Sequence, residues 1–313
     1  MPGSAGRLKT KEETVRINVE DENKGTKKHF TCAKSKLLRH MRYFEKYKAN
    51  AGKLSELDIS VHCDLDVFEW LMRYVEHDGH FVVQPPPEGA DQPKDANEVS
   101  EGAPVLSIWK VIPLIVSSEF LKMDALYGEC VRYVVTHIEA VAKVQISMKC
   151  LTPATIKRLA QQVDVERLDF IRDRRDKFIS KIFFKMLEMA LEEPANLLHR
   201  CVLCNRLFTE PAQKDLLCLR NKRIYVDAHG RLEAIHVRDS EFECKKFINF
   251  VKEKFRISWR EMYWKVWAYQ HSFRCSVCDN SFLLSELVHC SFHPCAASYG
   301  YSSNTGRFPC CSQ

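Results

Sequence analysis

Cysteine is the residue type in this chain with the clearest chemistry, and ten of the fourteen cysteines lie after residue 200. Two Cys-x-x-Cys pairs occur there, Cys201 with Cys204 and Cys275 with Cys278. Such a pair can direct both sulfurs inward from a tight turn, and two further ligands about a dozen residues later complete a tetrahedron around Zn²⁺. One complete ligand set has this spacing: Cys275, Cys278, Cys290 and His293.

The pair at Cys201 and Cys204 has a third ligand in reach, Cys218, but its fourth ligand is open. The candidates are His199, His229, His236 or a residue of the other pair. Residues 201–208 (the first knuckle) and 275–282 (the second knuckle) match at both cysteines and at the final phenylalanine. We therefore predict two turns of similar geometry, each supported by a buried aromatic ring. Zinc ligands are predicted in both turns, and the number of zinc ions stays open.

The remaining cysteines of this region are weaker candidates for metal ligation. Cys244 lies in an apolar pattern with Phe242 and Phe247, which favours a small buried hydrophobe over a ligand. Three cysteines remain, Cys295, Cys310 and Cys311. They either form part of a further site or are free thiols, and their spacing favours neither interpretation.

A disulfide framework is the alternative use of so many cysteines, and it requires an oxidising compartment. Residues 1–15 are polar and charged, without the apolar run of about seven residues that a secretory signal needs. No later segment approaches the roughly 18 uncharged apolar residues of a membrane span. We therefore expect an intracellular chain, nuclear or cytoplasmic, with reduced thiols and no membrane contact.

The expected zinc is structural rather than catalytic. A hydrolytic zinc keeps one position open for water and needs a base nearby, whereas the second quartet consists of four protein ligands. The acid near that site, Glu286, is expected to be an exposed helix residue. The neighbouring sequence contains no HExxH motif, nucleophile elbow or phosphate-binding glycine loop. The sequence thus predicts no enzyme.

Charge gives limited support to a nucleic-acid partner. The net charge is +6, and residues 201–313 hold 16 Lys and Arg against 11 Asp and Glu, which leaves 31 against 30 upstream. This basic bias is small for a nucleic-acid footprint, and zinc-bound thiolates reduce it further.

A helix opened by a capping box at Ser258 and Glu261 carries Trp259, Tyr263 and Trp267 on one face. This stripe could stack bases, but a core role is favoured.

The apolar patterning predicts which elements precede the cysteines. The predicted order is a hairpin at 15–33, a helix at 36–47, a strand at 57–61, a helix capped by Asp64, a mobile polar insertion at 78–103, and helices at 105–116, 119–123 and 125–141. Further helices follow between Pro153 and Pro194. The fold class is α+β, with a disordered lead at 1–13, a first domain at 14–141, a helical linker at 142–196 and a zinc-stabilised module at 197–313.

The first domain resembles a BTB (POZ) domain. The resemblance rests on the order of elements and on three segments, Leu37 to Phe44, Asp66 to Val75 and Ser118 to Met123. More narrowly, the chain is similar to the SANT-and-BTB-domain regulators of class-switch recombination, with a likeness that continues to Phe308-Pro309-Cys310-Cys311. Relatives can carry a SANT segment before the BTB domain and continue beyond the double cysteine. We expect this chain to lack the SANT part and to be a fragment, an isoform or a shortened member.

The resemblance implies a protein-interaction function. BTB domains form homodimers and recruit corepressors or cullin ubiquitin ligases, and the family name implies negative regulation of recombination or transcription. We expect a non-enzymatic scaffold or regulator; the alternatives are a cullin substrate adaptor and a zinc-dependent nucleic-acid-binding protein. The apolar positions Leu37, Leu38, Met41 and Phe44 could form a dimer face, although an ordinary core role is favoured.

Overall fold

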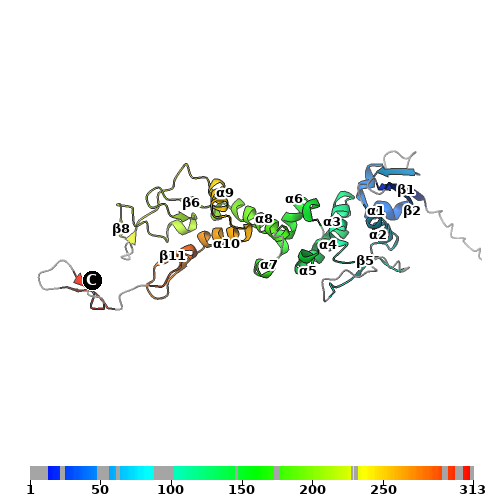
Figure 1. The fold of residues 1–313 in the computed structure, drawn as a ribbon. Coiled ribbons are helices and arrows are strands. Elements are labelled where there is room, and N and C mark those ends of the chain that lie inside the picture. Colours follow the sequence, from blue (N-terminus) through cyan, green and yellow to red (C-terminus); the bar gives the residue numbers. More distant parts are fainter. Residues whose placement is uncertain are drawn as a thin grey trace, which may run out of the picture. The chain divides into compact units, whose positions relative to one another are not determined.

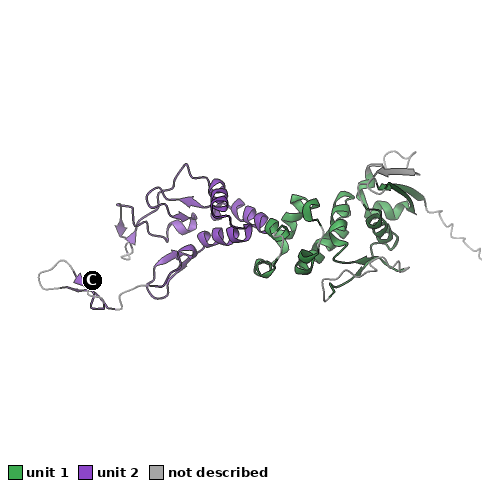
Figure 2. Cartoon of the chain, viewed as in Figure 1, with its two compact units in different colours: residues 1–182 green, residues 183–313 purple. Residues whose placement is uncertain are grey.

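The computed structural model describes residues 13–21, 25–47, 56–60, 64–87, 102–144, 147–172, 177–226, 228, 232–290, 295–299 and 306–310. The chain divides into two compact units, Met1–Ile182 and Phe183–Gln313 (Figure 2). This division falls inside the segment 142–196 that the sequence predicts as a helical linker. Predictions that concern residues 1–12, 88–101, His229, His293 or Cys311 lie outside the described residues.

Unit 1 begins with a three-stranded sheet in the order β2-β1-β3 (Figure 1). β1 (Thr14–Asp21) pairs antiparallel with β2 (Thr26–Ala33) and parallel with β3 (Glu56–Ser60). In β1, Val15, Ile17 and Val19 are buried, because alternate side chains of a strand point to the same face. The predicted hairpin is confirmed.

The helix predicted at 36–47 is interrupted at Met41. α1 (Lys34–His40) ends there, and a 3-10 helix, η1 (Arg42–Tyr47), continues the chain. The backbone N–H of Tyr43 donates to the carbonyl of Leu121 at 3.1 Å, so a long-range hydrogen bond competes with continuation of the helix. Leu37, Met41 and Phe44 are fully buried in the core, and Leu38 is partly buried.

The predicted cap at Asp64 is confirmed. The Asp64 carboxylate accepts a hydrogen bond from the backbone N–H of Asp66 at 3.1 Å, and α2 (Leu65–Glu76) follows. α2 packs against β1 and β2. Phe68 is fully buried there, with its ring centroid 5.2 Å from that of Phe30. The apolar stripe of this helix therefore covers the sheet.

The described beginning of the predicted polar insertion contains one short strand. β4 (Val82–Val83) pairs in parallel with β5 (Val105–Leu106), so the helix predicted from residue 105 is wrong at its start. The indole N–H of Trp70 donates to the Val105 carbonyl at 2.7 Å. This bond from α2 fixes β5 beside it and explains why tertiary contacts override the helical pattern.

The helical part of unit 1 consists of separate short helices. They are α3 (Val111–Phe120), α4 (Asp124–Thr136), α5 (Ile138–Lys143), η2 (Met148–Cys150), α6 (Pro153–Gln162) and α7 (Val165–Phe170). The predicted helix at 119–123 is wrong beyond residue 120, because Lys122 adopts a left-handed conformation with φ 57°. Thr152 caps α6 through a 3.1 Å bond from the Thr155 N–H. α8 (Phe178–Glu192) follows.

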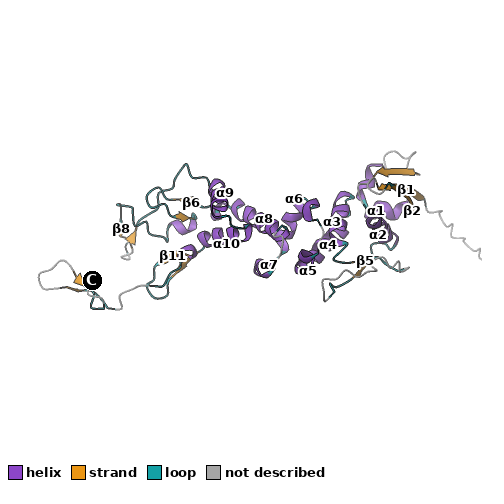
Figure 3. Ribbon diagram, viewed as in Figure 1, coloured by secondary structure: helices purple, strands orange, loops and turns teal. Residues whose placement is uncertain are grey.

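Unit 2 combines helices with strand pairs that are too small to form a core by themselves (Figure 3). After η3 (Pro194–Asn196), the pairs are β6 (His199–Arg200) with β7 (Leu207–Phe208), β8 (Tyr225–Val226) with β9 (Leu232–Glu233), β10 (Ser272–Arg274) with β11 (Ser281–Leu283), and β12 (Ser298–Tyr299) with β13 (Gly306–Arg307). The other elements are η4 (Pro211–Gln213), α9 (Cys244–Phe255), α10 (Trp259–Gln270) and η5 (Leu284–Glu286).

The helical core of unit 2 explains the aromatic stripe of α10. Met262 and Val266 are the fully buried positions of this helix, and Trp259 and Tyr263 are half-buried against the same cluster. Trp267 stacks on His271, with ring centroids 3.9 Å apart. Two of the three predicted stripe residues therefore pack on the core. The predicted capping box of Ser258 and Glu261 is confirmed.

Candidate metal centre

The first knuckle is a tight turn closed by its own backbone. The N–H of Cys201 donates to the Arg206 carbonyl at 2.9 Å, and the N–H of Asn205 donates to the Cys201 carbonyl at 2.9 Å. Asn205 has φ 62°, a left-handed conformation that asparagine tolerates better than most residues. β6 and β7 pair on either side of the turn, so both cysteines project from a short hairpin.

The second knuckle repeats this geometry between β10 and β11. The N–H of Cys275 donates to the Asn280 carbonyl at 2.9 Å, and the N–H of Asp279 donates to the Cys275 carbonyl at 3.0 Å. Asp279 has φ 59° at the position that Asn205 occupies in the first knuckle. The expected likeness of the two turns is confirmed. Their aromatic supports differ, because Phe208 is fully buried and Phe282 only partly.

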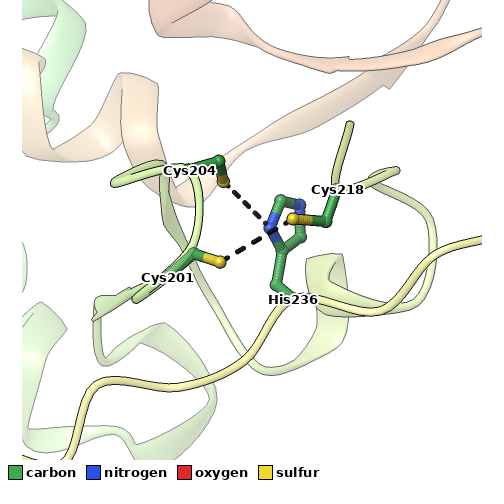
Figure 4. A group of neighbouring side chains, drawn as sticks. All are labelled: Cys201, Cys204, Cys218 and His236. Atoms are coloured by element: carbon green, nitrogen blue, oxygen red, sulfur yellow. Dashed lines mark hydrogen bonds between the residues drawn. The ribbon is translucent and has the colours of Figure 1, made fainter. Parts of the chain in front are cut away.

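Four side chains converge at the first knuckle (Figure 4): Cys201, Cys204, Cys218 and His236. Their ligand atoms all lie within 4.8 Å of one another. The Cys201 and Cys218 sulfurs are 3.8 Å apart, and the Cys204 sulfur is 3.4 Å from Nδ1 of His236. A tetrahedral zinc with Zn–S bonds of about 2.3 Å holds its sulfurs about 3.8 Å apart, whereas a disulfide requires about 2.05 Å. The group therefore fits zinc.

His236 is the histidine that completes this group. It lies in the segment 234–238, in which Ala234 and His236 are buried while Ile235 and Val237 are exposed. This segment is held beside the third cysteine by the N–H of Cys218, which donates to the Ala234 carbonyl at 2.8 Å. His199 lies in β6 and is not one of the four. The sequence gives no signal for His236, because its alternation with Ile235 and Val237 would by itself place the two apolar side chains inside.

The surroundings of His236 favour its neutral, metal-binding form. Burial lowers the pKa of His236, and the positive charge of Arg206 lowers it further. Its ring stacks on Phe208 with centroids 5.0 Å apart. Nε2 is buried and has no hydrogen-bond partner among the described residues, while Nδ1 faces the sulfurs. The ring is thus oriented toward the cysteines by packing.

The first-knuckle thiols titrate unequally. Burial raises the pKa of Cys201, but backbone N–H groups of the knuckle, including that of Cys204, outweigh it and lower the pKa overall. Burial raises the pKa of Cys204 to about 11. A turn that directs N–H groups at one sulfur stabilises its thiolate, which is the form that binds a metal.

Three ligands of the second predicted site also come together: Cys275, Cys278 and Cys290 lie within 4.8 Å of one another. Backbone N–H groups of Cys278 and Val277 lower the pKa of Cys275 to about 7. Hydrogen bonds with Cys275 and Cys278 raise the pKa of Cys290 to about 11. Cys290 is exposed, so this group is more accessible than the first. His293 lies outside the described residues and stays a prediction.

Glu286 is not the exposed helix residue that the sequence suggested. It ends η5 and its carboxylate accepts from Nε of Arg206 at 2.6 Å, with a second contact from Nη2 of the same side chain. Leu283, three residues earlier, is buried in one apolar cluster with Cys201 and Cys218. The hairpin of the second knuckle therefore packs on the first candidate site.

The other cysteines of unit 2 lie elsewhere. Cys244 is buried in the helical core with Ile248 and Val251, as its apolar pattern predicts. Cys295 and Cys310 are exposed and belong to neither group. Cys311 lies outside the described residues.

Comparison with known families concerns unit 1. Residues 15–131 match the family model described as the BTB domain of the SANT and BTB domain regulator of CSR. The chain carries a BTB domain of this family. The matched segment runs from β1 into α4, and both candidate metal groups lie after it. BTB domains are generally protein-interaction modules. No solved structure matches the chain.

No helix in the described part of the chain combines the length and the apolar character that a bilayer crossing requires. Among the helices that the structure describes, the longest is α8 with 15 residues, and a membrane-spanning helix needs about 20.

Proposed function

We propose that this chain is a non-catalytic protein-interaction scaffold or regulator. Its BTB domain self-associates or docks one partner, and its C-terminal unit recognises another. The match of residues 15–131 to a BTB domain carries this proposal, because BTB domains are generally interaction modules. Corepressors and cullin ubiquitin ligases are the two partner classes that we propose for the BTB domain, and a pull-down with a purified cullin separates them.

We further propose that unit 2 holds two structural zinc ions. Cys201, Cys204, Cys218 and His236 would bind the first, and the 3.8 Å sulfur separation supports a tetrahedral arrangement. Cys275, Cys278 and Cys290 would bind the second together with His293. Four protein ligands leave no position for a reacting water, so each zinc stabilises the fold and does not catalyse a reaction.

The small strand pairs of unit 2 support the structural role of zinc. β6–β7 and β10–β11 each contribute only two or three residues per strand, and an isolated two-stranded hairpin is marginally stable in water. A bound zinc joins the first knuckle to residues 218 and 236 in later segments. The free energy of metal binding then contributes directly to folding.

Nucleic-acid binding through the aromatic stripe of α10 has less support. Trp259 and Tyr263 pack on the core of unit 2, which removes part of their rings from the surface. We therefore place protein interaction first.

Native mass spectrometry of the full chain, combined with light scattering over a concentration series, tests both proposals. We expect a dimer with two zinc ions per chain, and the denatured mass should lose the metal. A mass that stays monomeric at all concentrations would contradict self-association. If the chain bound a single zinc ion, which Cys290→Ser retained and Cys218→Ser lost, metal binding would be restricted to the first group.

A further inference from the structure

The outer side of the first metal group is apolar. Val202 and Val237 lie beside the antiparallel bridge between Cys201 and Arg238, and the Val202 N–H donates to the Val237 carbonyl at 2.9 Å. Ile235 lies two residues from Val237 and points the same way. Val202 is 55% exposed, Ile235 53% and Val237 47%. With Leu203, which is also exposed, these residues form what we call the outer apolar face.

The convergence of Cys201, Cys204, Cys218 and His236 fixes the direction of these side chains. Cys201 precedes Val202, and His236 lies between Ile235 and Val237, so each inward ligand forces its neighbours outward. A shift of one residue would bury Ile235 and Val237 but would turn His236 away from the sulfurs. The exposure of the outer apolar face therefore follows from the inward direction of Cys201 and His236, and exposed apolar patches are typical of interaction sites.

A cationic loop borders this face. The side-chain amide of Asn221 donates to the Ile235 carbonyl at 2.8 Å and fixes the loop beside the strand. Three neighbours of Asn221 are basic: Arg220, Lys222 and Arg223. None of the three forms an ion pair with another described residue, and β9 contributes one exposed acid, Glu233. Among the described residues of this border, three basic side chains thus outnumber one acid.

We propose that the outer apolar face and its cationic loop dock a partner-protein segment that carries aliphatic side chains together with Asp or Glu. The proposal deepens the scaffold function and rests on it. The aliphatic residues would fill the face, and the acidic residues would pair with Arg220, Lys222 and Arg223. Protein is favoured over single-stranded nucleic acid because the face is built of Val, Leu and Ile, which offer no ring for base stacking.

A random-peptide display library panned against the full, zinc-loaded chain tests this inference. We expect the enriched peptides to combine Leu, Ile, Val or Phe with Asp and Glu. For the best peptide, the double variant Ile235→Ser with Val237→Ser should weaken binding roughly tenfold or more, because two buried aliphatic contacts are lost. Val82→Ser with Val83→Ser is the matched control, since these valines are equally exposed in unit 1, and it should leave binding unchanged.

Charge reversal adds a second readout. The double variant Arg220→Glu with Lys222→Glu should weaken binding of the acidic peptide. It should strengthen binding of a peptide in which Lys replaces each Asp and Glu. Zinc content and light scattering on each variant show whether the metal groups and BTB self-association persist, so failure of docking is distinguishable from failure of the scaffold proposal. The inference would be overturned if the Ile235/Val237 double variant bound the peptide as tightly as the Val82/Val83 control. Enrichment of basic peptides would also overturn it. So would tighter binding of oligonucleotides or anionic vesicles than of the acidic peptide.

Discussion

Arg206 and Glu286 lie 80 residues apart and form a two-pronged ion pair that connects the two cysteine knuckles. The Arg206 carbonyl also accepts the N–H of Cys201, so the same residue closes the first knuckle and binds the end of η5. The two halves of the cysteine-rich unit are therefore one structure. A substitution of either residue should therefore destabilise both metal groups.

Removal of this pair should destabilise unit 2 cooperatively. In a double-mutant cycle of Arg206→Ala and Glu286→Ala, we expect a coupling free energy of about 1–3 kcal/mol, because the side chains are only 22% and 37% exposed. The Arg274–Asp279 pair of the second knuckle is the control, since it is 55% and 75% exposed and should couple by about 0–1 kcal/mol. Urea unfolding measures both. Equal couplings would contradict the bridging role.

Loss of one buried cysteine should remove one zinc. We expect Cys218→Ser to reduce the zinc content by one ion per chain and to lower the Tm of unit 2 by about 5–10 °C, because the metal joins three segments. Cys150→Ser changes an exposed cysteine outside both groups and should do neither. Native mass spectrometry and calorimetry give the two readouts, and an unchanged zinc count in Cys218→Ser would be decisive against the site.

The two zinc ions should leave at different rates. Cys201 and Cys218 are buried, whereas Cys290 is exposed, so a chelator reaches the second group with less local opening. We expect two phases of zinc release in excess EDTA, with the second group faster by roughly tenfold. Cys290→Ser should remove the fast phase alone. A single phase that both Cys218→Ser and Cys290→Ser abolish would instead indicate one shared site.

The residue with a left-handed backbone in each knuckle should tolerate glycine better than valine. Asn205 has φ 62°, where glycine is unstrained and a β-branched residue is not. We expect Asn205→Gly to change stability little and Asn205→Val to cost about 1–3 kcal/mol. Asp279→Gly and Asp279→Val should follow the same order. Chemical denaturation of the four variants checks this, and equal effects of Gly and Val would show that the backbone conformation does not limit stability.

The capping box of α10 should make the stability of the fold decrease at acid pH. Glu261 accepts from the Ser258 backbone N–H at 2.6 Å and from its hydroxyl at 2.8 Å, and these bonds lower the Glu261 pKa. The folded-state pKa lies below the unfolded one, so the stabilisation is complete above about pH 4.3 and is lost as pH falls through the folded value. Glu261→Gln should reduce this loss of Tm at acid pH, measured between about pH 3 and about pH 6. Glu253→Gln, an exposed residue of α9, should leave it unchanged.

Local patterns predicted the elements whose geometry is local. The hairpin of β1 and β2, the cap at Asp64 and the capping box at Ser258 follow from neighbouring residues alone, and the structure contains all three. The predicted helix at 36–47 is interrupted at Met41, and the Tyr43 N–H bonds to the distant Leu121 carbonyl. A pattern of apolar spacing contains no information about such a partner.

The sequence by itself determined the two knuckles, because Cys-x-x-Cys spacing and a residue tolerant of positive φ specify a tight turn within eight positions. It also placed Cys218 in the first group. Only the tertiary structure selected His236 among the histidines and joined Arg206 to Glu286. Both depend on pairing between segments far apart in the chain, where backbone hydrogen bonds such as Cys218 to Ala234 set which side chains meet.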